Sequence, residues 1–114
     1  MQRSPQQEHR LFKVVKQTRR QTRERRTVEL HIAKGRAQFS VVDRHRQRRQ
    51  RFVLKQIREL ELSTVDGARC LIHMHDGRVV DLTFESTTHC RAFCRQLRRQ
   101  LPLLQTRHNT ALRR

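Results

Sequence analysis

Short apolar runs separated by polar or basic stretches recur along most of the chain. Between Thr27 and Ala33, Val28, Leu30 and Ile32 alternate with polar or charged residues. This period of two is typical of a β-strand with one buried face. Similar runs predict seven strands in all, at residues 10–17, 27–33, 37–43, 51–54, 57–62, 70–75 and 78–84.

Turn signals separate several of these runs. Lys34-Gly35, Asp66-Gly67 and Asp76-Gly77 each place a glycine between two predicted strands. Glycine adopts positive φ angles readily, so these dipeptides favour tight connections between antiparallel neighbours. The strands are therefore expected to be joined mainly as hairpins.

The period changes from two to about 3.6 after Ser86, which predicts one helix. The apolar residues of this segment fall at i, i+3, i+4, i+7 and i+11, on a single stripe; they are Cys90, Phe93, Cys94, Leu97 and Leu101. Ser86 or Thr87 is a suitable N-cap, and Pro102 ends the helix. The prediction is one mostly β domain at 10–102 with a C-terminal helix, a flexible N-terminus at 1–9 and a flexible basic tail at 103–114.

This order of elements resembles the pleckstrin-homology superfold. The resemblance rests on seven strands followed by one helix, on Asp76-Gly77-Arg78 between the last two strands, and on Phe84 ahead of a helix centred on Phe93. It implies a seven-stranded antiparallel barrel or sandwich capped by the helix. The chain has no Trp, whereas most members carry one in the closing helix. A divergent relative is therefore implied, and many such relatives bind proteins rather than lipids.

Positive charge dominates the composition and bears directly on function. The 114 residues include 27 Lys and Arg but only 10 Asp and Glu, a formal net charge of +17. Two dense clusters, at 16–26 and 44–51, fall where loops between strands are predicted. Such clusters attract phosphate headgroups, nucleic-acid backbones or acidic proteins. The candidate anion-binding residues are Lys16, Arg19, Arg20, Arg23, Arg25, Arg26, Arg44, Arg46, Arg48 and Arg49.

The resemblance adds a more specific expectation for these clusters. Phosphoinositide-binding pleckstrin-homology domains carry a Lys near the end of the first strand and a basic-x-Arg sequence entering the second. Lys16, Arg23 and Arg25 are similar to that arrangement. In the family, the loop between the third and fourth strands also lines the headgroup site, which implies a role for the second cluster.

Other chemistry is not expected. The sequence has no glycine-rich phosphate loop, zinc-ligand spacing or nucleophile elbow, so neither an enzyme nor a cofactor is predicted. His73 and His75 share a strand face, but the sequence offers no good third metal ligand. Cys90 and Cys94 are expected to be core residues, and the odd count of three cysteines argues against a disulfide framework.

The favoured function is a non-enzymatic module that binds phosphoinositide headgroups or an anionic membrane surface. An alternative is a protein–protein interaction module of a larger intracellular assembly that recognises an acidic partner. Nucleic-acid binding through the phosphate backbone alone is a second alternative. With no signal peptide or membrane span in the sequence, an intracellular, cytoplasmic location is expected, at most at the inner face of a membrane. The headgroup, the partner, the organelle and the oligomeric state are left open, as is whether the chain is an excised domain.

Overall fold

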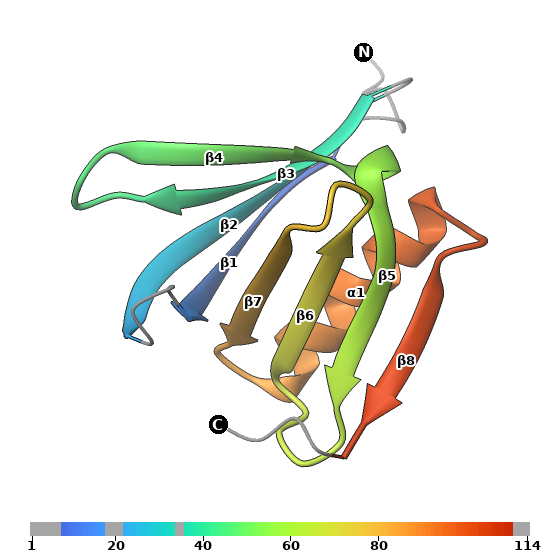
Figure 1. The fold of residues 1–114 in the computed structure, drawn as a ribbon. Coiled ribbons are helices and arrows are strands. Elements are labelled where there is room, and N and C mark those ends of the chain that lie inside the picture. Colours follow the sequence, from blue (N-terminus) through green and yellow to red (C-terminus); the bar gives the residue numbers. More distant parts are fainter. Residues whose placement is uncertain (1–7, 18–21, 34–35, 111–114) are drawn as a thin grey trace.

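In the described part of the chain, one eight-stranded sheet and one helix make up the fold (Figure 1). The structure, a computed structural model, describes residues 8–17, 22–33 and 36–110. The elements are β1 (Glu8–Gln17), β2 (Arg23–Ala33), β3 (Arg36–Asp43), β4 (Arg48–Val53), the 3-10 turn η1 (Leu54–Gln56), β5 (Ile57–Ser63), β6 (Arg69–Met74), β7 (Val79–Phe84), α1 (Thr87–Gln100) and β8 (Gln105–Asn109). The prediction of a mostly β chain with one helix near the C-terminus is confirmed.

Two antiparallel runs of strands meet at a short junction. The sheet order is β4-β3-β2-β1-β7-β6-β5-β8. β1 to β4 form one run and β5 to β7 the other, and they are joined by pairing of β1 with β7 from Val14↔Phe84 to Lys16↔Leu82. Figure 1 shows the sheet bending strongly between the two runs, with α1 behind β5, β6 and β7.

The sheet departs from the predicted seven-stranded antiparallel barrel in two respects. β8 is an eighth strand and pairs in parallel with β5. Among the strands that the structure describes, β4 and β8 stand at opposite ends of the order, so the sheet is not closed. β8 was not predicted, because the run Gln-Thr-Arg-His-Asn contains no apolar residue.

Several predicted boundaries also need correction. The segment 103–114 was expected to be a flexible tail, but it contains β8. Glu8 and His9, expected within the flexible N-terminus, belong to β1. β2 begins at Arg23 rather than at 27, because hydrogen bonding to β1 continues through residues with no apolar alternation. The Lys34-Gly35 turn lies outside the described residues.

Phe93 of α1 lies at the centre of the hydrophobic core. Its ring is fully buried and lies 5.5 Å from that of Phe12, 5.9 Å from Phe39 and 5.0 Å from Phe84. These partners come from β1, β3 and β7, so one helical side chain contacts both runs of the sheet. The predicted helical stripe is confirmed, and Ser86 caps the helix by accepting a hydrogen bond from the His89 N–H at 3.1 Å.

The three cysteines are core residues, as predicted for Cys90 and Cys94. Cys70, Cys90 and Cys94 are all buried, and the sulfur of Cys94 lies 3.9 Å from that of Cys70. Hydrogen bonding to Cys94, together with burial, raises the pKa of the Cys90 thiol far above its ordinary value. The Cys90 thiol therefore stays protonated, and all three cysteines pack as small apolar side chains.

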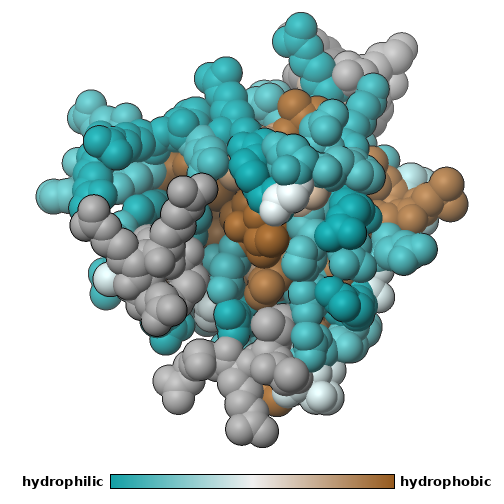
Figure 2. All heavy atoms as spheres, in the orientation of Figure 1, coloured by the Kyte–Doolittle hydropathy of each residue, from teal (hydrophilic) through white to brown (hydrophobic). Residues whose placement is uncertain are grey.

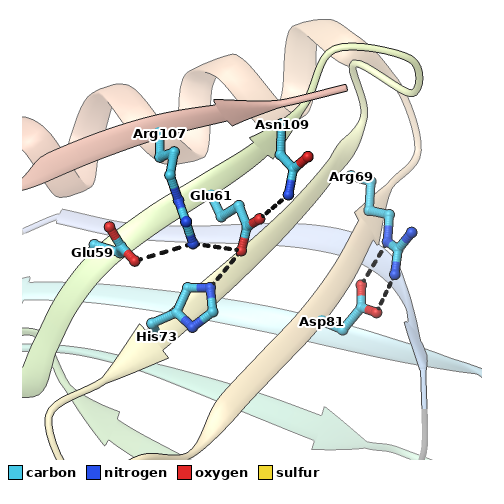
Figure 3. A network of polar contacts seen from close by, with 7 residues as sticks. All are labelled: Glu59, Glu61, Arg69, His73, Asp81, Arg107 and Asn109. Carbon is cyan, nitrogen blue, oxygen red and sulfur yellow. Dashed lines mark hydrogen bonds and ion pairs between the residues drawn. The ribbon is translucent and has the colours of Figure 1, made fainter. Parts of the chain in front are cut away.

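A polar network holds β8 in place on the face of the sheet that points away from the hydrophobic core (Figure 3). Glu61 of β5 is 5% exposed, and its carboxylate accepts hydrogen bonds from His73 at 2.7 Å and from the Asn109 amide. Arg107 lies 3.3 Å from both Glu59 and Glu61. Two of the three partners of Glu61, Arg107 and Asn109, come from β8, so side-chain polar contacts hold this strand as well as backbone hydrogen bonds.

We expect Phe93→Ala to destabilise the fold by about 3–5 kcal/mol, because it leaves a cavity where Phe rings from β1, β3 and β7 converge on the helix. Urea denaturation followed by circular dichroism measures the loss. Leu103→Ala is the matched control, since Leu103 is 94% exposed, and it is expected to change stability by less than about 0.5 kcal/mol. Equal effects of the two substitutions would contradict the central position of Phe93.

We expect Glu61→Gln to destabilise the protein by about 1–3 kcal/mol at pH 7, because it weakens a buried hydrogen-bonded carboxylate. The hydrogen bond from Asn109, aided by His73 and Arg107, holds the pKa of Glu61 below its ordinary value of 4.5. The stabilisation is therefore complete above pH 4.5 and is lost as the pH falls through the lowered pKa.

The difference in the free energy of unfolding between wild type and Glu61→Gln should therefore become smaller as the pH falls below about 4.5. Urea unfolding across a pH series measures it. Glu85→Gln, at an exposed position, serves as the control and should show little difference at any pH. If that difference in unfolding free energy did not change with pH, the ionised carboxylate would be ruled out as the source of the stabilisation.

Candidate basic hollow

A hollow of about 750 Å³ lies where β1, β2, β3 and β7 come together. Its lining includes five cationic side chains and two carboxylates, which give a formal net charge of +3. The charged residues are Lys13, Arg23, Arg25, Arg26, Arg44, Asp43 and Glu85, and the others are Val14, Val15, Thr27, Val42, His45, Thr83 and Phe84. We call this site the basic hollow.

Strand alternation explains how cations come to surround the hollow. In β1, Phe12 and Val14 point into the core, so Lys13 and Val15 lie on the opposite face of the sheet. Pairing places Thr27 beside Lys13 and Arg25 beside Val15. Lys13 and Arg25 therefore share one face of the sheet, whereas Arg26, paired with Val14, lies on the other.

Asp43 shapes the β3–β4 connection at the rim of the hollow. Its Oδ1 atom accepts hydrogen bonds from the backbone N–H groups of His45 at 3.1 Å and Arg46 at 3.2 Å. Burial opposes ionisation of the carboxyl, but the Arg46 N–H and the Arg26 guanidinium outweigh it and lower the pKa of Asp43. The ionised carboxylate thus fixes the turn that carries Arg44.

Arg26 is occupied by neighbouring acids. Its guanidinium contacts Glu24 at 2.5 Å and lies 3.5 Å from Asp43, and its side chain is only 14% exposed. By contrast, Lys13, Arg23, Arg25 and Arg44 are exposed, and none of them forms an ion pair with another residue in the described part of the chain. These four cations are available to an anion that enters the hollow.

The predicted site residues divide into three groups. Arg23, Arg25, Arg26 and Arg44 line the hollow, as a shared binding site requires. Four others do not line it: Lys16, half-buried on β1; Arg46, in the turn after β3; and Arg48 and Arg49, on β4. Arg19 and Arg20 lie outside the described residues.

Lys13 and Glu85 were not among the predicted site residues, whereas His45 belongs to the second predicted cluster, at 44–51. Lys13 stands between two core residues of β1, Phe12 and Val14, so it lies on the opposite face of the strand. Only the pairing of β1 with both β2 and β7 shows that this face adjoins the arginines of β2. Glu85 reaches the site because β7 ends beside β1.

Hydrophilic side chains cover most of the face seen in Figure 2, and apolar residues show as separate patches between them. Within residues 8–17, 22–33 and 36–110, no group of three His, Cys, Asp or Glu side chains is arranged to hold a metal ion. The same residues include no helix of the length and apolar character needed to cross a bilayer. The charge of the hollow is thus its main chemical feature.

Comparison with known proteins adds no assignment. No protein-family model matches this sequence, and no curated protein matches it. The chemistry of the hollow therefore rests on its own residues: guanidinium groups form paired, charge-assisted hydrogen bonds with phosphate or carboxylate oxygens.

We expect Asp43→Ala to loosen the turn at 44–47, because two backbone N–H groups lose their acceptor. Amide hydrogen exchange of His45 and Arg46 should quicken by about tenfold, which corresponds to the loss of one ordinary hydrogen bond. Ser63→Ala is the matched control, since its hydroxyl accepts from Val65 and Asp66 in a separate turn. Unchanged exchange at 44–47 in Asp43→Ala would show that another contact holds the turn.

Proposed function

We propose that the protein is a non-enzymatic binding module whose basic hollow holds the polyphosphorylated headgroup of a phosphoinositide. One observation carries the proposal. Four exposed cations without ion-pair partners among the described residues, Lys13, Arg23, Arg25 and Arg44, surround one hollow and come from three segments of the chain. Convergence of separate segments distinguishes a binding site from a run of solvated charges.

The dimensions and chemistry of the hollow suit such a ligand. A volume of about 750 Å³ falls within the range of small-molecule sites. A headgroup with several phosphates offers many acceptor oxygens, and each arginine can engage two of them. Basic residues close to an anionic membrane surface add about 1 kcal/mol each. The surrounding positive charge would thus strengthen binding to a headgroup still attached to its lipid.

The strand arrangement supports the resemblance to pleckstrin-homology domains. β1 to β4 and β5 to β7 form two consecutive antiparallel runs, and α1 follows β7. β8, the absence of Trp and the position of Lys16 outside the hollow depart from the familiar pattern. The proposal therefore depends on the observed cations rather than on the family motif.

The placement of aromatic residues favours a headgroup over a nucleic acid. All five Phe residues are buried, and the sequence contains no Tyr or Trp. Single-stranded nucleic acids are usually held by stacking of bases on exposed aromatic rings. Binding of RNA to this surface would rest on the phosphate backbone alone and would be strongly salt-dependent.

We expect Arg25→Ala to weaken binding of inositol 1,4,5-trisphosphate by about tenfold, because one charge-assisted pair of hydrogen bonds is lost. Arg95→Ala removes the same charge from the exposed side of α1 and is the matched control. Amide chemical shifts recorded at two salt concentrations measure both affinity and location. Saturable shifts should concentrate at Lys13, Arg23–Thr27, Arg44 and His45.

The same titration with a short single-stranded RNA separates the alternatives. Diffuse shifts at all basic positions, lost at moderate salt for both ligands, would overturn the proposal and show non-specific attraction. An equal loss of inositol trisphosphate affinity in Arg25→Ala and Arg95→Ala would also overturn the proposal.

A further inference from the structure

The outer edge of β4 is open in the described structure. β4 is the terminal strand of the sheet and pairs only with β3, from Gln38↔Val53 to Asp43↔Arg48. In an antiparallel pair, every second residue directs its N–H and C=O groups away from its neighbour. β4 therefore presents a row of backbone donors and acceptors that no other described strand meets.

This edge is firmly anchored to the core. Phe52 of β4 is 2% exposed and stacks on Phe39 of β3, with ring centroids 4.8 Å apart. The guanidinium of Arg78 lies 5.0 Å from the centre of the Phe52 ring on another side. An edge strand held in this way is a preformed template and needs little ordering when a second strand pairs with it.

β4 carries three arginines in six residues and no acid. Arg49 is neutralised by Glu29, at 2.6 Å. Arg48 and Arg51 are exposed and form no ion pair with any other described residue. Strand alternation places Arg51 on the same face as Arg49, and Arg48 on the opposite face. Uncompensated positive charge therefore flanks the open backbone edge on both faces.

The charge decides which strand could join this edge. Pairing with β4 of a second copy would bring arginines of the two copies together, and like charges on paired strands are destabilising. A segment with acidic side chains gains both the backbone hydrogen bonds and the arginine contacts. We propose that the β4 edge binds an extended acidic segment of a partner protein as an added β-strand.

The geometry defines the partner further. β4 has six residues, so the added segment is about as long. Side chains alternate between faces, so a carboxylate at every second position would follow the face of Arg51, which forms no ion pair with any other described residue. This site is separate from the basic hollow, because none of the β4 residues lines the hollow.

The test uses a fluorescent eight-residue peptide of alternating Glu and Thr and the whole chain. Arg51→Glu should weaken peptide binding by about tenfold or more, through loss of a charge-assisted contact and added repulsion. Arg95→Glu makes the same charge change on α1 and is the matched control. Hydrogen exchange should show peptide-dependent protection within 48–53, and circular dichroism checks that both variants fold.

A second probe needs no change to the protein. Two versions of the same peptide are made, each with a different alternating set of backbone nitrogens methylated, and both keep the charge of the peptide. In one of them the methyl groups replace the N–H groups that face β4, so that version cannot form the ladder. At least one pattern should lose about tenfold or more in affinity. Inositol trisphosphate in the hollow should not displace the unmodified peptide, which separates this site from the proposed headgroup site.

Three results would overturn the proposal. These are equal losses for Arg51→Glu and Arg95→Glu, unchanged binding of both methylated peptides, or protection confined to residues outside β4. Sedimentation of the free protein supplies a fourth: a stable dimer that Arg51→Glu strengthens would show that a second copy occupies the edge.

Discussion

The packing of Phe93 between the two runs of strands is the interaction on which the rest of the structure depends. β1 and β7 are joined over only three residue pairs, from Val14↔Phe84 to Lys16↔Leu82. The helix reinforces that junction, because the Phe93 ring contacts aromatic rings on both sides of it. A fixed junction in turn fixes the basic hollow, since β7 and the β1–β2 pair form opposite sides of the same site.

In a chain with a net charge of +17, the positions of the ten acidic residues also matter for the fold. At least seven of the ten acidic residues pair with arginines, and several of these pairs hold strands or turns together. Arg69 and Asp81, for example, form a two-point contact between β6 and β7 (Figure 3). Because these acidic residues form ion pairs within the fold, many Lys and Arg side chains elsewhere in the described part of the chain have no acidic neighbour. A bound anion would reduce the repulsion among those positive charges.

Two surfaces of different geometry each hold several of the uncompensated cations. The basic hollow is concave and has side chains from three segments, which suits a compact ligand with many phosphate oxygens. The β4 edge is linear and offers backbone groups between its arginines, which suits an extended acidic chain. Because the two surfaces share no residue, the two proposed ligands would not compete for the same side chains.

The mostly β architecture, the helix and its buried stripe could be predicted from the order of residues alone, because the periods of two and 3.6 follow from local backbone geometry. The order of residues also located Arg23, Arg25, Arg26 and Arg44 through their density in the chain. Only the tertiary structure separated these from Lys16 and Arg49, added Lys13 to the site and revealed β8. Strand pairing decides which distant residues become neighbours, and β8 is held by contacts with Glu59 and Glu61 rather than by any apolar pattern of its own.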